Sequence, residues 1–295
     1  MLLKRILADK ANGLWMITSL VTILALPLVI GTGLYLKASP LFDQQSFFSL
    51  VFSADWAPSE GRFGFRPYIT GSLYVTLLSF LFTLPVCLLS AIYLTQFSSQ
   101  WLIRTMHPVI DVLAGLPSVI YGVWGVLIVV PLVAGNIAPA FGTSSAGYSI
   151  LSGGIVLAIM CIPYILNMLI EVFRTVPAGL IEASLSMGAT RWESVKHVVI
   201  RGNYPGIISA YGLGIAKAFG ETIAVMMVVG NVVKVSGNPF DAAYPLPALI
   251  ANNYGEMLSI PMYDSALMFA AFLLLIIILI FNMIFRYLIH KTRKQ

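Results

Sequence analysis

The sequence predicts an all-helical polytopic membrane protein, and three observations support this fold class. Hydrophobic residues make up 59% of the 295 residues and charged residues only 10%, against about 25% charged in an average soluble domain. The mean hydropathy is +0.91. Long apolar stretches approach or exceed the roughly 20 residues that a helix needs to cross a hydrocarbon core of about 30 Å. A bilayer, rather than a soluble core, accounts for this much apolar sequence.

Six spanning helices are expected, at residues 14–36, 67–97, 107–133, 150–172, 204–232 and 262–288. Glycine and proline interrupt several of them, which a membrane protein tolerates where neighbouring helices or cavities satisfy the freed backbone groups. The first stretch is longer than the apolar region of a signal peptide, so we expect a retained anchor. We divide the chain into residues 1–66, an anchor helix with the first outer loop, and residues 67–295, a membrane core.

The distribution of lysine and arginine predicts that both termini face the cytoplasm. With the N-terminus inside, twelve of the seventeen cationic residues fall in cytoplasmic segments, four in outer loops, and Lys217 inside the membrane. Cytoplasmic loops are the ones enriched in these residues. The four outer cations are Lys37, Arg62, Arg66 and Lys234. The net charge of +5 therefore reflects topology, so we expect contact with membrane lipid and no nucleic-acid partner.

Three outer loops are expected, at residues 37–66, 135–148 and 234–261, and the sequence assigns no function to them. The third contains a short apolar piece at residues 246–251. This piece is too short to span a bilayer and is expected to form a re-entrant or surface helix.

The sequence contains none of the common catalytic or metal-binding motifs. G-x-x-x-x-G-K-[ST], G-x-S-x-G and H-E-x-x-H are all missing. Cys87 and Cys161 lie within apolar spans and are expected to be buried structural thiols. His107, His197 and His290 are scattered over cytoplasmic ends, where headgroup contacts or helix capping are expected. We therefore expect no enzyme, no catalytic residue, no metal site and no cofactor in this chain.

The cytoplasmic loop at about residues 173–203 predicts two short amphipathic helices. Pro177 suits the first turn of a helix, apolar residues then recur at helical spacing, and Gly188 suits the helix end. A second amphipathic piece runs from Trp192 to Arg201. The two helices either form a rigid knob that another protein contacts or lie on lipid headgroups, and periodicity alone favours neither.

The segment Glu182-Ala183-Ser184-x3-Gly188 resembles the E-A-A-x3-G loop of ABC importer permeases. In that family the loop forms a coupling helix that docks in a groove of the ATP-binding subunit. Glu182, Ala183 and Gly188 match the motif, Ser184 departs from it, and Arg201 stands where the family has proline. The resemblance implies the type I importer transmembrane fold and coupling to a separate ATPase.

Two further stretches resemble phosphate permeases of the PstC type. They are residues 114–125, AGLPSVIYGVWG, and residues 217–225, KAFGETIAV, followed by VGN at 229–231. This resemblance implies the permease subunit of an ATP-driven phosphate importer in the cytoplasmic (inner) membrane of a bacterium or archaeon. It also implies a second, PstA-like permease subunit, a PstB-like ATPase dimer that binds ATP and Mg²⁺, and a PstS-like extracytoplasmic phosphate-binding protein.

Lys217, Glu221 and Thr222 are candidate residues of the substrate pathway. An ionisable residue in mid-membrane costs roughly 2.5–3.5 kcal/mol, so such residues pair or line a wet cavity. Lys217 and Glu221 are four residues apart and can meet on one helix face. The pair either attracts phosphate or only joins two helices, and the resemblance favours the first interpretation. The family normally has arginine in place of Lys217, so a point charge replaces a two-pronged donor.

Ser118 and Tyr121 are the other candidates for the pathway. Pro117 predicts a kink or break in the third span, because proline cannot donate to the preceding turn. The freed N–H groups and the Ser118 hydroxyl then suit an anion, and Tyr121 adds a hydroxyl one turn later. An ordinary packing kink is the alternative. Asp111 is expected to cap the helix or pair with Arg104 rather than touch substrate.

Two other functions stay open from the sequence. The first is a permease of the same architecture for another oxyanion, such as molybdate, tungstate or sulfate. The second is an ion-driven secondary transporter that uses Lys217, Glu221 and Asp111 as a relay. The loop motif counts against the second, as does the lack of an inverted repeat.

Overall fold

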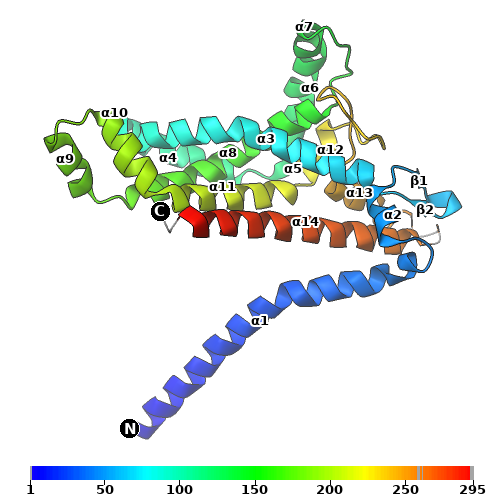
Figure 1. Cartoon of the computed structure of the whole chain (residues 1–295), viewed down its shortest axis with the longest axis horizontal. Helices are drawn as coiled ribbons and strands as arrows, with labels where there is room; N and C mark the ends of the chain where they lie inside the picture. Colours follow the sequence, from blue (N-terminus) through cyan, green and yellow to red (C-terminus); the bar gives the residue numbers. More distant parts are fainter. Residues whose placement is uncertain (1, 258–259, 261, 293–295) are drawn as a thin grey trace.

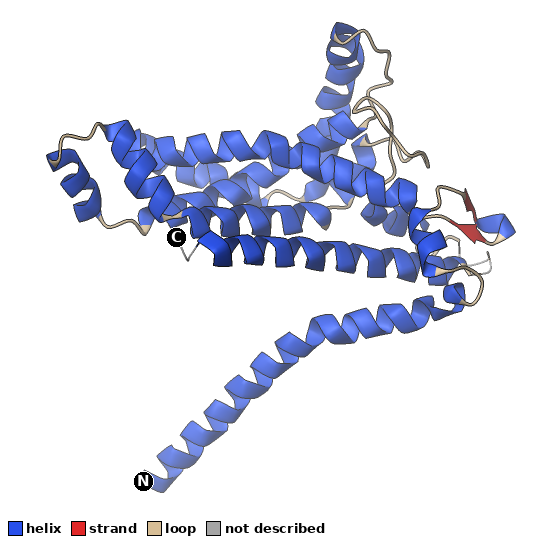
Figure 2. Ribbon diagram, viewed as in Figure 1, coloured by secondary structure: helices blue, strands red, loops and turns tan. Residues whose placement is uncertain are grey.

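The computed structural model describes residues 2–257, 260 and 262–292, and nearly all of them lie in helices (Figure 2). The α-helices are α1 (Leu2–Phe42), α2 (Phe47–Phe52), α3 (Arg66–Ile92), α4 (Gln100–Gly115), α5 (Ser118–Trp124), α6 (Val130–Leu132), α7 (Ala138–Ala140), α8 (Ile150–Arg174), α9 (Ala178–Ser186), α10 (Arg191–Ser194), α11 (Tyr204–Phe219), α12 (Ile223–Val228), α13 (Leu246–Asn253) and α14 (Tyr263–Thr292). The π-helical segments Tyr93–Phe97, Gly125–Val129, Val133–Ile137 and Val195–Ile200 extend or join them. Residues 258, 259 and 261 of the predicted third outer loop, with Arg293 and Lys294 of the cytoplasmic cations, lie outside the described residues.

The all-helical membrane fold class is confirmed. Within the described residues, five helical segments are long and apolar enough to cross a membrane: Asp9–Phe42, Arg66–Phe97, Ser118–Ala140, Ile150–Arg174 and Tyr263–Thr292. α3 and α8 pack along each other at the centre, and α11 fills the space between α8 and α14 (Figure 1). Both described ends of the chain lie toward the end of the bundle that carries α9 and α10 (Figure 1).

The third predicted span has different boundaries in the structure. Residues 107–115 belong to α4, which ends at Gly115, and a new helical segment runs from Ser118 to Ala140. Leu116 is extended, with φ −66° and ψ 134°, because the ring of Pro117 disfavours a helical residue before it. The break expected at Pro117 is therefore confirmed. The single helix over residues 107–133 was wrong, since hydropathy does not show where a helix stops and restarts.

The fifth predicted span, residues 204–232, is not one helix. α11 ends at Phe219, residues 220–222 leave the helix, and α12 continues in a new direction (Figure 1). α12 packs against α5, where a Cβ added to Gly122 would lie 3.2 Å from the Ala224 Cα. This close backbone approach is a contact between segments that are distant in sequence. The apolar sequence of residues 204–232 therefore does not indicate that the helix breaks there.

The first outer loop folds onto the end of the bundle opposite α9. After α2, the strands β1 (Trp56–Ala57) and β2 (Arg62–Phe63) form an antiparallel hairpin, and Arg62 pairs with Asp55 and Glu60. The Trp56 ring lies 4.8 Å from Tyr68 of α3 and 6.0 Å from Tyr263 of α14, centroid to centroid. The third outer loop contributes α13, whose Leu246 and Leu249 are fully buried. The short helix expected there exists, and it is packed into the protein rather than laid on the surface.

α1 contacts the bundle mainly through its C-terminal half. There Leu41 is fully buried and the Tyr35 ring lies 5.8 Å from Phe272 of α14. Toward the N-terminus α1 diverges from the bundle, and Trp15 is 74% exposed (Figure 1). This half of α1 presents an apolar surface of the kind that lipid covers.

Candidate functional site

A cavity of about 190 Å³ lies where the two helix breaks meet. Its lining residues are Leu113, Ala114, Leu116, Ser118, Tyr121, Met160, Lys217 and Glu221. They come from the end of α4 and the residue after it, from α5, from the middle of α8, from the last turn of α11 and from the turn that follows α11. Four of the five predicted pathway residues therefore line one cavity. The fifth, Thr222, begins α12 beside it, and its hydroxyl donates to the Gly220 carbonyl at 3.3 Å.

The break at Pro117 fixes the positions of Ser118 and Tyr121. The Tyr121 side chain is 6% exposed, and its hydroxyl donates to the Leu113 carbonyl at 2.7 Å. Leu113 belongs to the last turn of α4, whose carbonyls lose their helical partners when the helix stops. Tyr121 thus closes the end of α4, while Ser118 at the start of α5 lines the cavity.

Lys217 and Glu221 line the same cavity but do not form the contact that their i, i+4 spacing predicted. α11 ends between them, and in the described part of the chain no ion pair joins the two side chains. Lys217 Nζ lies 4.5 Å from the ring centroid of Tyr164 on α8, a cation–π contact. A Glu221 carboxylate oxygen accepts the Ala224 N–H at 3.5 Å, in the first turn of α12. Each charge therefore has a contact of its own, although both side chains line one cavity.

Tyr164 is the site residue that sequence reasoning missed. It lies in an apolar stretch of α8 and belongs to no motif. An aromatic residue in a spanning helix is ordinary, so no local signal could connect it to Lys217. The connection depends on α8 and α11 packing against each other.

Two nearby polar residues have partners that the sequence did not predict. Asp111 accepts a hydrogen bond from the Asn167 amide of α8 at 3.1 Å and does not pair with Arg104. His107 bonds to Arg174, with its Nε2 2.5 Å from Nη2, and its contact with lipid headgroups stays a prediction. Both partners come from α8, which the sequence does not place beside α4. Cys87 and Cys161 are buried and free, as expected, and the described residues contain no group of three side chains suited to a metal ion.

The predicted coupling segment forms α9, directly after Pro177. Glu182, Ala183 and Ser184 lie in this helix, and Gly188 ends it with φ +86°, a left-handed conformation that glycine adopts without strain. No residue of α9 is buried, and Met187 is 88% exposed. α9 is therefore largely exposed on the surface of this chain.

The second amphipathic piece begins at α10 with a capping box. Thr190 accepts the Glu193 N–H, and the Glu193 carboxylate accepts the Thr190 N–H at 2.8 Å and its hydroxyl at 2.8 Å. These bonds hold the pKa of Glu193 below its ordinary value, and the bond from the Thr190 backbone N–H has the largest effect. The helix continues through Val195–Ile200, with Val199 fully buried. Chain direction then changes at Asn203, and Pro205 lies in the first turn of α11.

Comparison with known proteins gives one consistent family. Residues 84–294 match the family described as binding-protein-dependent transport system inner membrane component. The chain is 33% identical to the probable ABC transporter permease protein YqgH of Bacillus subtilis, over 97% of this chain and 92% of that protein. It is 36% identical to the phosphate transport system permease protein PstC of Xylella fastidiosa, over 78% of this chain and 74% of that protein. The probable phosphate transport system permease protein PstC of Methanocaldococcus jannaschii is 32% identical, over 84% and 82%.

The fold has a solved counterpart. An inward-facing structure of the MetNI methionine ABC transporter matches 78% of this chain and 94% of its own with a TM-score of 0.56 at 22% identity. The match bears on the fold alone, and it agrees with the type I importer fold implied by the loop motif. The chain is thus a multi-pass transport permease, and it belongs to the family of binding-protein-dependent transport system inner membrane components.

Proposed function

We propose that this chain is the permease subunit of an ATP-driven phosphate importer. The observation that carries the proposal is the cavity where Lys217, Glu221, Ser118 and Tyr121 meet at two helix breaks. A membrane cavity with one cation free of a carboxylate partner suits a small anion. The PstC relatives, which cover most of the chain, support phosphate as that anion.

Lys217 is the proposed anchor for the anion. Its ammonium lies on the Tyr164 ring, a contact weak enough to be exchanged for an anion, while Glu221 stays at the start of α12. A compact lysine charge attracts phosphate without a rigid two-pronged grip, which favours release on the far side. Ser118 and Thr222 supply hydroxyl groups beside the path.

The energy comes from outside the chain in this proposal. ATP and Mg²⁺ bind to a dimeric PstB-like ATPase, and α9, with Glu182, Ala183, Ser184 and Gly188, carries its closure to the membrane core. The absence of any buried residue in α9 supports this role. Lys217 is exposed at the surface of this chain, which supports a second, PstA-like permease subunit that completes the pathway. A PstS-like extracytoplasmic protein delivers the phosphate.

Residues 67–295 form the core of the permease in this proposal, and residues 1–66 form an anchor and outer cap. The family match over residues 84–294 supports the first assignment, and the divergence of α1 from the bundle supports the second.

The test is phosphate uptake by the complete importer in proteoliposomes. Lys217→Gln is expected to lower uptake by about tenfold or more, because a hydrogen bond to a charged group contributes about 1.5–3 kcal/mol. Lys217→Arg retains most uptake, and Arg201→Gln, on the exposed cytoplasmic surface, serves as the matched control. Full uptake by Lys217→Gln would contradict the anchor role. Transport of sulfate or molybdate in preference to phosphate would contradict the substrate.

A further inference from the structure

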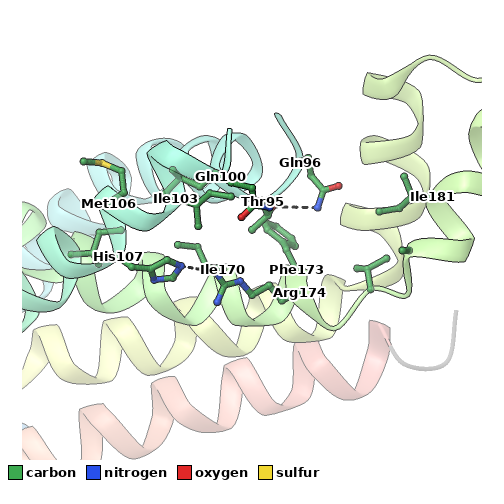
Figure 3. Close-up of a pocket in the computed structure, with 14 residues that line it drawn as sticks. Thr95, Gln96, Gln100, Ile103, Met106, His107, Ile170, Phe173, Arg174 and Ile181 are labelled. Carbon is green, nitrogen blue, oxygen red and sulfur yellow. Dashed lines mark hydrogen bonds between the residues drawn. The ribbon is translucent and has the colours of Figure 1, made fainter. Parts of the chain in front are cut away.

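Two cavities lie beneath α9, separate from the pathway cavity. The first, of about 310 Å³, is lined by the segment Tyr93–Phe97 that follows α3, by α4, by α8 and by α9 (Figure 3). The second, of about 210 Å³, lies between α9 and α10. Gln96 and Ile181 line both, so the two are neighbours. We call them the α9 cavities; none of their lining residues lines the pathway cavity.

Each of the α9 cavities has one guanidinium and no carboxylate among its lining residues. Arg174 lines the first and Arg191 the second. Glu171 approaches Arg174 from outside, with 3.2 Å between Oε1 and Nη1. Glu193 is held by the capping box and Glu182 lines neither cavity. The lining therefore contains two guanidiniums and no carboxylate, and Glu171 offsets the charge of Arg174 from outside while no salt bridge to Arg191 is found among the described residues.

The remaining polar groups can both donate and accept hydrogen bonds, and the Gln96 amide N–H donates to Thr95 Oγ1 at 3.3 Å (Figure 3). Arg174 Nη2 donates to His107 Nε2 at 2.5 Å, because a guanidinium can only donate (Figure 3). Gln96 and Gln100 bring side-chain amides to the first cavity. The second holds Ser194, which is 1% exposed and whose hydroxyl has no hydrogen-bond partner in the described residues. A buried hydroxyl is nearly always bonded, so an unpartnered one beside an arginine points to an acceptor that enters from outside.

The other walls are apolar. Ile103, Ile170 and Phe173 line the first cavity, and Leu185 and Val195 the second. Two guanidiniums and an unpartnered buried hydroxyl beside apolar walls are complementary to a phosphate group, whether it is free or carried on an acyl chain.

We propose that the α9 cavities bind a phosphate group beneath the proposed coupling helix. Arg174, Arg191 and Ser194 donate to its oxygens, and Gln96 bridges the two halves of the site. The bound group connects α9 and α10 to the ends of α3, α4 and α8. When the site is occupied, α9 is held more rigidly against the bundle. Binding therefore controls how completely a movement of α9 is transmitted to the membrane core. An anionic phospholipid and free phosphate present the same chemistry.

The test uses the complete importer with Lys217→Gln in every sample, so that the pathway contributes little to binding. One arm adds radiolabelled inorganic phosphate to nanodiscs of phosphatidylcholine. The other adds phosphatidylglycerol to the nanodiscs and measures the lipid retained by native mass spectrometry. Binding in one arm identifies the source. Arg174→Gln with Arg191→Gln is expected to weaken that binding by about tenfold or more. Arg201→Gln, which lines neither cavity, is expected to leave it unchanged.

Ser194→Ala provides a second readout, since it removes one hydroxyl without changing charge and is expected to weaken binding severalfold. If the double arginine variant fails to assemble, the Ser194→Ala variant alone tests the proposal. Binding of neither probe, or equal binding by Ser194→Ala and the parent complex, overturns the proposal. If Lys217→Gln loses phosphate uptake while the α9 cavities still bind the probe, the α9 cavities are distinct from the transport site.

Discussion

Gly188 sets the end of α9, and replacing it tests how much this single residue contributes. Its φ of +86° is left-handed, and a Cβ added there meets nothing within 4 Å. Gly188→Ala therefore carries only the backbone cost of a left-handed residue, about 1 kcal/mol. That cost raises the local opening equilibrium of α9 about fivefold. Gly188→Asn is expected to behave closer to glycine, because asparagine tolerates this conformation.

The assay is hydrogen–deuterium exchange of peptides covering α9 in the assembled, nucleotide-free importer. Gly179→Ala is the matched control: Gly179 lies inside α9, and an added Cβ also meets nothing within 4 Å. Because alanine is a better helix former, this change is expected to slow exchange, by about 0.5–1 kcal/mol of local stability. The two alanine variants should thus move exchange in opposite directions. Exchange that changes in the same direction in both, or stays unchanged in Gly188→Ala, would refute the reasoning.

Three further predictions follow from single contacts. Tyr164→Leu removes the aromatic ring that Lys217 contacts, and it is expected to strengthen binding of inorganic phosphate to the importer by about fivefold, because a cation–π contact is worth about 1 kcal/mol. Tyr164→Phe keeps the ring and should bind phosphate as the parent does. Weaker phosphate binding by Tyr164→Leu would contradict this role of the ring. Because the pKa of Glu193 is lowered, the capping box stabilises α10 fully at pH values above the ordinary carboxyl pKa of 4.5, and this stability is lost as the pH falls through the lowered pKa. In a carbon-13 NMR titration, the titration midpoint of the Glu193 carboxyl group should rise in Thr190→Ala. An unchanged midpoint would argue against the cap. Gly214→Ala places a Cβ 2.4 Å from Ile165 Cγ1 and is expected to lower the free energy of unfolding, measured by thermal unfolding, by about 1–3 kcal/mol. Adding Ile165→Val should restore part of this stability. Gly202→Ala, whose added Cβ meets open space, should leave stability unchanged.

The pathway site shows where prediction from sequence succeeded and where it failed. Ser118 and Tyr121 were placed by Pro117, and Lys217 by the rarity of a cation in an apolar stretch; both are local signals. The partners were not predictable in the same way. Lys217 contacts Tyr164, and Asp111 contacts Asn167, through helices that lie many residues away in sequence. The i, i+4 rule failed for Glu221 because it assumes a continuous helix, and α11 ends at Phe219.

The sequence by itself determined the helical membrane fold, the break at Pro117 and the limits of α9 between Pro177 and Gly188. These depend on apolar length, on a missing N–H and on a positive φ, which are properties of a few neighbouring residues. Only the tertiary structure decided the break after α11, the choice of Tyr164 as the partner of Lys217, and the cavities under α9. Those features arise where α8 meets α4 and α11, and where α9 lies over the bundle. Contacts between distant segments depend on how whole helices pack, and no local pattern encodes them.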